Sequence, residues 1–241
     1  MLSTIERFRN AFFEANGEDA AALVTSGENR FYLTGFHSSA GAVLVTSKKS
    51  YFMTDFRYAE AARRVVKDCE VLCTRRTTET ICDLLKQDHV QRVLVEYDKL
   101  SLKRACLFEQ AFAAVGAAEE KGEKLDLLLQ ELRTIKTPDE IRKLKEAQKI
   151  TDDAFTHILD YIRAGRTERE VALELEFFMR KEGAEGVSFD FIVVSGKNGS
   201  LCHGVPSDKV IEDGDFVTMD TGALLHGYHA DMTRTVAVGH V

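Results

Sequence analysis

The amino-acid sequence predicts an α/β protein. Short apolar stretches of strand composition alternate with segments of helical periodicity, turn residues separate them, and helix-capping patterns recur along the chain. The 241 residues provide enough chain for one large domain or two modest ones, each with a buried core.

Composition and charge exclude several classes of protein. The chain has 32 Lys and Arg against 39 Asp and Glu, a formal net charge of −7, which gives no sign of a nucleic-acid partner. No apolar run approaches the roughly 20 residues that span a bilayer, and the N-terminus lacks the pattern of a secretory signal. The 5 cysteines are scattered, which disfavours both a disulfide framework and a structural zinc site. We therefore expect a cytoplasmic protein with reduced thiols and with neither nucleic-acid nor membrane partners.

The first half of the chain resembles a small domain of strands and helices. A capping box, Ser3-x-x-Glu6, predicts a first helix through Phe13. The apolar stretches predict strands at 20–25, 31–33, 42–46, 51–54, 70–74 and 92–97. Helical periodicity predicts helices at 55–66, 80–86 and 102–115.

A charged stretch separates the two halves of the sequence. Residues 119–124 (EEKGEK) are interpreted as a solvated linker, with the domain boundary between about 120 and 137. We therefore predict two domains, residues 1–125 and residues 126–241.

The second half begins with a complete set of helix-start signals. Thr137 is the expected N-cap, Pro138 occupies the first helical position, and Glu140 closes a capping box. Apolar spacing then predicts a long helix that ends near Gly165, and a second capping box predicts another helix over residues 167–183. A strand (FDFIVVS), a glycine-containing loop (GKNGS) and a strand pair follow.

Residues 216–238 carry the pattern that is most informative about chemistry. Two flanks of strand composition surround a centre that can turn, which predicts an antiparallel hairpin. With the turn centred between residues 225 and 226, Asp220 lies directly opposite Asp231, and their Cβ atoms are about 4.5–5.5 Å apart. With the turn one residue later, Asp220 lies opposite Thr233 and Asp231 is its diagonal neighbour, still within reach.

Two opposed carboxylates on a half-buried sheet repel each other unless they share a proton or a cation. Hard divalent ions favour carboxylate oxygens, and two metal ions about 3.5–4 Å apart are a known arrangement for hydrolysis. The alternative is that Asp220 and Asp231 lie in solvent or pair with Arg234, although strand alternation places Arg234 on the opposite face. Thr233 shares the face of Asp231 and could support a ligand with its hydroxyl.

Two histidines are further candidates. His203 lies in the segment CHGVP, where Gly204 and Pro206 restrict the backbone, so its imidazole could act as a proton shuttle or a donor to substrate. An ordinary loop histidine is the alternative. His229 precedes Asp231 by two residues on the same face and is a weaker candidate, because a packed or exposed side chain explains it better. The loop SGKNGS lacks the spacing of a phosphate loop, which disfavours a nucleotide site.

In combination these motifs resemble the pita-bread metallopeptidases, the group that contains Xaa-Pro aminopeptidase, prolidase, creatinase and methionine aminopeptidase. MDTG around Asp220 and GYHADMTRT around Asp231 resemble the start of the metal site of the family. SGKNGSLCHGVP resembles its active-site loop, with His203 at the position of the family histidine. RTIKTPDE resembles the entry to the catalytic domain, and ENRFYLTGF and MTDFRYAEAA resemble the creatinase-type N-terminal domain.

The resemblance implies a fold and an activity. The fold would be α/β: a creatinase-like N-terminal α/β domain, followed by the N-terminal half of a pita-bread (α+β) catalytic domain. The activity would be a metal-dependent aminopeptidase or dipeptidase that cleaves Xaa-Pro bonds with a hydroxide bridging two metal ions. Asp220 and Asp231 would be metal ligands, and His203 would be catalytic and substrate-binding. The cofactor would be two divalent ions, manganese first, with cobalt or zinc as alternatives. The partner would be a peptide with proline in second position, and the full-length form would be a homodimer.

One departure from the family bears on activity. The family completes its metal site with one His and two Glu further along the chain than residue 241. We therefore expect a fragment that binds metal weakly and hydrolyses little by itself. Two other functions remain open: a non-catalytic pita-bread module that binds peptides or proteins, and a creatinase-like C–N hydrolase acting on a small non-peptide substrate.

Overall fold

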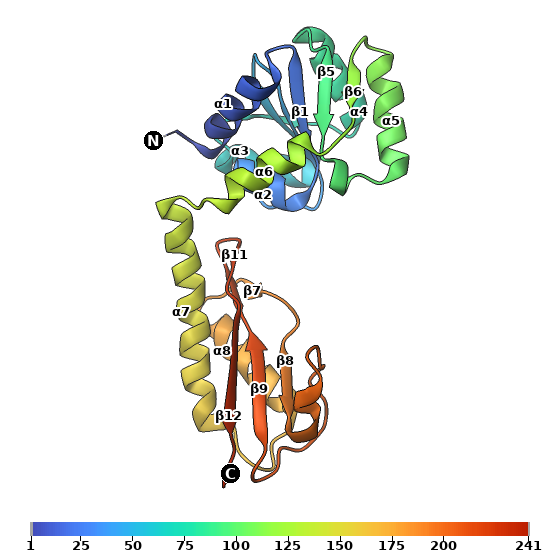
Figure 1. Cartoon of the computed structure of the whole chain (residues 1–241). Helices are drawn as coiled ribbons and strands as arrows, with labels where there is room; N and C mark the ends of the chain where they lie inside the picture. The colour runs from blue at the N-terminus through green and yellow to red at the C-terminus, as the bar shows by residue number, and fades with distance from the viewer. Residues whose placement is uncertain (1, 241) are drawn as a thin grey trace. The chain divides into compact units, whose positions relative to one another are not determined.

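A computed structural model describes residues 2–240, which form two compact units, one ending at Ile135 and the other beginning at Lys136 (Figure 1). This boundary lies within the predicted range of about 120 to 137, whereas the division drawn at residues 125 and 126 falls inside helix α6 (Lys124–Thr134). α6 belongs to the first unit, since Leu125 and Leu129 are buried in the core of that unit. The prediction of an α/β protein is confirmed.

A six-stranded mixed sheet forms the centre of the first unit, in the order β4-β3-β2-β1-β5-β6. β2 pairs antiparallel with β1 and β3, and the remaining pairs are parallel. The strands are β1 (Ala20–Val24), β2 (Ala42–Val45), β3 (Ser50–Thr54), β4 (Glu70–Cys73), β5 (Arg92–Val95) and β6 (Ala118–Glu120).

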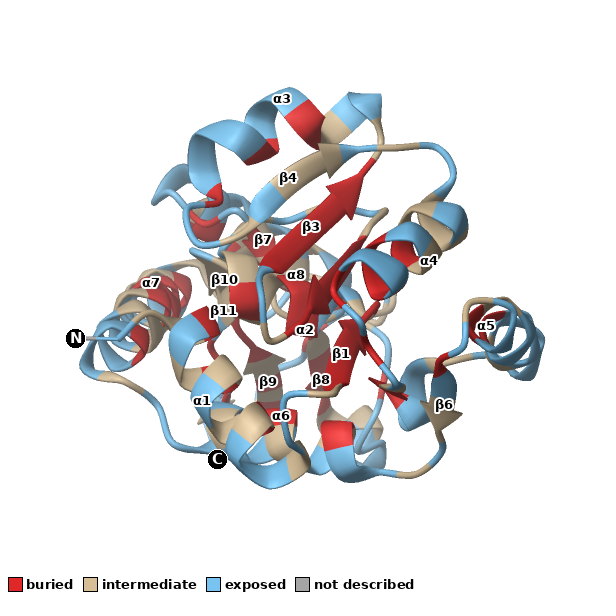
Figure 2. Cartoon of the chain, turned by 90° about the horizontal axis from the view of Figure 1, so that it is seen from above, coloured by how far each residue is buried: buried red, intermediate tan, exposed pale blue. Residues whose placement is uncertain are grey.

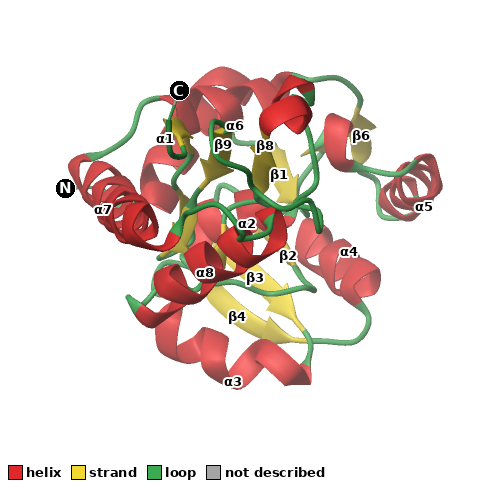
Figure 3. Cartoon of the chain, turned by 90° about the horizontal axis from the view of Figure 1, so that it is seen from below, coloured by secondary structure: helices red, strands yellow, loops and turns green. Residues whose placement is uncertain are grey.

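Helices cover both faces of this sheet. One face packs against α1 (Thr4–Asn16), α2 (Gly27–Thr34), α3 (Phe56–Val65) and α6, and the other against α4 (Thr77–Gln87) and α5 (Leu102–Ala113). α3 and α4, which pack on opposite faces, are both visible beside the strands in Figure 3. With both faces covered, β1 and β3 are buried along their whole length (Figure 2), which explains why β1 is a continuous apolar run and why β3 has three successive apolar or aromatic residues at its centre.

Two predictions for the first half are wrong. The predicted strand at residues 31–33 is part of α2, because the Ser26 side chain caps the N-terminus of that helix and Gly35 ends it in the left-handed conformation. The predicted linker at 119–124 is also structured, since β6 pairs with β5 and α6 begins at Lys124. In both places pairing or capping overrides the composition of a short stretch.

The second unit places two helices on one face of its strands. They are α7 (Pro138–Tyr161) and α8 (Glu168–Lys181), and both begin with the predicted capping boxes. The strands are β7 (Gly186–Val187), β8 (Ile192–Ser195), β9 (Phe216–Thr221), β10 (Ala223–Leu225), β11 (Tyr228–His229) and β12 (Met232–Ala237). They form two three-stranded antiparallel sheets, β11-β10-β7 and β12-β9-β8.

The core of the second unit lies between these helices and the strands. It contains Ile150, Ala154 and Ile158 of α7, Val171, Leu175 and Met179 of α8, and Val193, Val217 and Met219 of the sheet. Within residues 136–240, no helix packs on the opposite face of β9 and β12, where Thr233 and Thr235 are exposed. Among residues 2–240, no helix is both long and apolar enough to cross a membrane.

The assignment of α6 to the first unit can be tested with two leucines of the same helix. Leu129→Ala should lower the free energy of unfolding by about 2–5 kcal/mol, because Leu129 is 1% exposed and its removal leaves a cavity. Leu127→Ala should change it by less than about 0.5 kcal/mol, because Leu127 is 57% exposed. Urea unfolding followed by circular dichroism measures both; equal effects would contradict the packing of α6.

Candidate functional site

The hairpin that carries the two aspartates pairs Asp220 with Thr233. The first predicted register, with Asp220 directly opposite Asp231, is therefore wrong, and the second is confirmed. The reason is the turn, since His226 and Gly227 both adopt positive φ (54° and 72°), the conformation of a two-residue type I′ turn. A turn centred on these two residues fixes the pairing of every residue in the hairpin.

The strand pairing of the hairpin is interrupted at the level of Asp231. Gly222 separates β9 from β10, and Ala230 and Asp231 separate β11 from β12. The backbone of Ser188 donates a hydrogen bond to the carbonyl of Gly222 (2.8 Å) at this break. Asp231 therefore lies outside the regular strands, with its side chain exposed.

Both carboxylates are free to accept a cation. Asp220 lies on the face of β9 opposite the buried Val217 and Met219, and the hydroxyl of Thr233 donates a hydrogen bond to its Oδ1. Among residues 2–240, neither Asp220 nor Asp231 forms an ion pair. The Arg234 guanidinium instead donates to the carbonyl of Thr233 (2.8 Å), so the alternative of an ion pair with Arg234 is not observed there.

His203 is carried by a loop that folds back onto β8. Successive backbone hydrogen bonds join Leu201 to Asn198 (2.9 Å) and Gly204 to Leu201 (3.0 Å). Gly204 is buried so closely against Val194 that an added Cβ would lie 2.5 Å from the Val194 Cγ1. The backbone beside His203 is therefore held against the sheet while the histidine itself is exposed.

One cleft of about 480 Å³ brings the three predicted residues together. His203, Asp220 and Asp231 all line it. Its other lining residues are Phe189, Asp190, Phe191, Ile192, Gly204, Val205 and Pro206. The cleft thus combines four polar side chains, one histidine and three aspartates, with otherwise apolar walls, the usual character of a small-molecule or peptide site.

Sequence reasoning missed Asp190 as a cleft residue. This exposed carboxylate lies between Phe189 and Phe191, whose rings meet edge to face with centroids 6.4 Å apart. The only signal in the sequence is a charged residue inside the aromatic segment FDF. His229, the weaker candidate, is exposed on β11 and does not appear among the residues that line the cleft.

The chemistry of the donors fits part of a metal site. Carboxylate oxygens suit hard divalent ions, and two neighbouring negative charges attract a cation. Among residues 2–240, however, no three His, Cys, Asp or Glu side chains are grouped as ligands of one ion. Asp220 and Asp231 could therefore supply two ligands, and the described residues do not group a third with them.

The start of the His203 loop depends on Gly196. Gly196 has a positive φ of 50°, and a Cβ added there would overlap the carboxylate of Asp215. That carboxylate accepts hydrogen bonds from Lys209 Nζ (2.7 Å) and from the backbone of Glu212 (3.0 Å). The hydrogen bond from Lys209 is the main reason why the pKa of Asp215 is lowered.

Two glycines of this loop give a matched test. Gly196→Ala should cost about 2–3 kcal/mol of unfolding free energy, because alanine resists this φ and displaces Asp215. Gly199→Ala should stay within about 0.5 kcal/mol, since its added Cβ has no neighbour within 4 Å. Thermal or urea unfolding compares them, and a Gly196→Ala protein as stable as Gly199→Ala would show that the loop start is not constrained.

Both units match known protein families. Residues 5–135 match the Creatinase/Prolidase N-terminal domain, and residues 142–241 match Metallopeptidase family M24. The two matched segments fall in the two structural units. The resemblance inferred from the motifs is thereby confirmed.

Similar proteins include peptidases whose chains are longer. The uncharacterized peptidase YqhT of Bacillus subtilis (strain 168) is 42% identical over 238 residues, which are 98% of this chain and 65% of that protein. The solved structure of a Xaa-Pro dipeptidase from Bacillus anthracis has a TM-score of 0.89 at 44% identity, with 98% of this chain and 65% of that chain covered. A prolidase from Pyrococcus furiosus has a TM-score of 0.84 at 32% identity, with 95% and 69% covered.

The chain thus spans about 65% of the length of the first two of these relatives. Its fold agrees with that of the Bacillus anthracis dipeptidase over 98% of its residues. The family matches and these likenesses lead to one conclusion: the chain belongs to metallopeptidase family M24, in the branch that carries a creatinase/prolidase N-terminal domain.

Proposed function

We propose that this chain carries part of the active site of a metal-dependent peptidase that cleaves Xaa-Pro bonds, as an aminopeptidase or a dipeptidase. The observation that carries the proposal is the single cleft lined by His203, Asp220 and Asp231. Relatives described as Xaa-Pro dipeptidase and prolidase support the same class of substrate.

Asp220 and Asp231 would hold divalent metal ions together with further ligands. We propose manganese as the metal, with cobalt or zinc as alternatives, because carboxylate oxygens suit such ions. When bound, the metal supplies Lewis-acid polarisation of a carbonyl and lowers the pKa of water. Thr233 would orient Asp220 for this role through the hydrogen bond that its hydroxyl donates to Oδ1.

The remaining cleft residues would bind and orient the peptide. The His203 imidazole, exposed at the cleft, would donate a hydrogen bond to the oxygen of the scissile carbonyl and stabilise the charge that develops on it. The apolar side chains of Phe189, Phe191 and Val205 would contact the proline ring and exclude water from it.

Metal binding tests the role of the aspartates. Isothermal titration of the chain with MnCl₂ should detect weak binding, because two carboxylates supply fewer oxygen ligands than an octahedral ion takes. Asp220→Asn and Asp231→Asn should each weaken it by at least about tenfold, since each removes one charged ligand. Asp160→Asn, on the exposed side of α7, is the control and should leave the titration unchanged. Equal titrations for all variants would contradict the proposed metal site.

Hydrolysis tests the role of His203. In a preparation of the protein that cleaves the dipeptide Ala-Pro when manganese is present, His203→Ala should lower kcat by about 10²–10⁴-fold. The same substitution should leave the manganese titration unchanged. His229→Ala is the control, an exposed histidine of the same unit that does not line the cleft, and it should keep the activity. Binding of a proline peptide without metal and without hydrolysis would instead support a non-catalytic module.

A further inference from the structure

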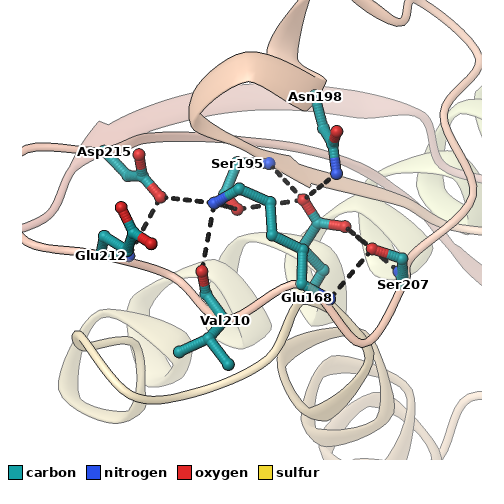
Figure 4. Close-up of polar contacts among 8 residues, drawn as sticks. Glu168, Ser195, Asn198, Ser207, Val210, Glu212 and Asp215 are labelled. Atoms are coloured by element: carbon teal, nitrogen blue, oxygen red, sulfur yellow. Dashed lines mark hydrogen bonds and ion pairs between the residues drawn. The ribbon is translucent and has the colours of Figure 1, made fainter.

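Glu168 joins the two ends of the loop that carries His203 (Figure 4). It is the first residue of α8, and it is 0% exposed. Its Oε1 accepts hydrogen bonds from the backbone N–H (2.7 Å) and hydroxyl (3.0 Å) of Ser195 and from the side-chain amide of Asn198 (3.1 Å). Its Oε2 accepts from the backbone N–H (3.2 Å) and hydroxyl (2.6 Å) of Ser207.

The first turn of α8 reinforces this connection through its backbone. The N–H of Glu168 donates to the carbonyl of Lys209 (3.1 Å), and the N–H of Arg169 donates to the carbonyl of Ser207 (3.0 Å). The N-terminus of a helix also favours a negative charge. The helix therefore holds the chain on both sides of residues 199–206, the segment that contains His203.

A second chain of polar contacts extends from the same carboxylate. The hydroxyl of Ser195, which donates to Glu168, accepts a hydrogen bond from Lys209 Nζ (3.0 Å), and Lys209 is paired with Asp215 (2.7 Å). Figure 4 shows Asp215, Ser195, Glu168 and Ser207 along this line. A buried carboxylate with this many donors is stabilised as the anion and is sensitive to the loss of any of them.

The charge of Glu168 agrees with this geometry. Burial raises the pKa of its carboxyl, but the hydrogen bonds from Ser207, Ser195 and Asn198 outweigh burial and lower the pKa below its ordinary value. The carboxylate does not line the cleft, so its effect on the site must pass through the loop.

We propose that Glu168 is a positioning residue, which fixes residues 199–206 between Asn198 and Ser207 and so holds the imidazole of His203 at the cleft beside Asp220 and Asp231. The role of His203 at the cleft rests on the proposed function, whereas the placement of residues 199–206 by Glu168 does not.

Glu168→Gln tests the proposal. The amide keeps the shape of the side chain but replaces one acceptor oxygen by a donor, so one end of the loop loses its partner. Hydrogen exchange followed by NMR should show that the amides of Leu201 and Gly204 exchange at least about tenfold faster, with little change in the core amides of β9. The His203 ring signals should shift in the same variant.

Glu96→Gln is the matched control. Glu96 is also 0% exposed, and its carboxylate accepts hydrogen bonds from the backbone and hydroxyl of Ser26 and from the side chain of Asn29, in the first unit. It reproduces the loss of a buried, hydrogen-bonded carboxylate without touching the His203 loop. The exchange of Leu201 and Gly204 should therefore stay at the wild-type rate.

The proposal would be overturned if the amides of Leu201 and Gly204 exchanged at the wild-type rate in a folded Glu168→Gln protein. It would also be overturned if Glu96→Gln accelerated their exchange to the same extent. If Glu168→Gln does not fold, Asn198→Ala and Ser207→Ala each remove one side-chain donor from one end of the loop. Each should accelerate exchange of the same amides by about threefold, and no acceleration in either would equally overturn the proposal.

Activity separates this proposal from the proposed function. In a preparation that cleaves Ala-Pro, Glu168→Gln should lower kcat at least about tenfold with unchanged manganese affinity, whereas Glu96→Gln should not. If the metal-loaded wild-type protein neither cleaves Ala-Pro nor binds it, the proposed function fails, while the exchange of Leu201 and Gly204 still decides the role of Glu168.

Discussion

The turn at His226 and Gly227 is the constraint on which the second unit depends. Two successive residues with positive φ force a two-residue turn, and a two-residue turn sets the register of the strands that it joins. Side chains alternate between the faces of a strand, so a slip of one residue would carry Asp220 into the core and expose Met219. The buried face and the carboxylate face are therefore specified together by one turn.

The same division into two faces explains how the site can carry unpaired charge. α7 and α8 bury the apolar side of the sheet, which stabilises the unit, while Asp220 and Asp231 lie where water can solvate them. The third group of the site, His203, does not come from the hairpin. It comes from a loop whose ends are held by a buried carboxylate at the start of α8, so the helix that covers one face also places a side chain at the other.

Local signals in the sequence predicted much of this fold. Capping boxes at Ser3, Thr137 and Thr167 are confirmed, because the residues that form them lie three positions apart and need no tertiary partner. Short stretches whose state depends on distant partners were harder to predict. The sequence predicts a strand at 31–33, which lies in α2, and a linker at 119–124, which overlaps β6. A helix cap decides the first case, and pairing with β5 decides the second.

The candidate site shows the same limit. The identities of Asp220, Asp231 and His203 follow from motifs, but the register that separates the aspartates follows from the conformation of the turn. The contribution of Glu168 depends on Ser195, Asn198 and Ser207, which lie 27 to 39 positions away in the sequence. No periodicity or short motif reports such a contact.

The central claim is that the aspartates and His203 belong to one metal-binding cleft. Paramagnetic broadening by Mn²⁺ tests it most directly, because a bound paramagnetic ion broadens the NMR signals of groups close to it. The account predicts that substoichiometric Mn²⁺ broadens the His203 ring and the backbone of Val205, and that Asp231→Asn abolishes the effect. The ring of His157, which stacks on Phe178 of α8 on the helical side of the sheet, should stay sharp. Broadening of His157 but not of His203, or no difference between wild type and Asp231→Asn, would contradict it.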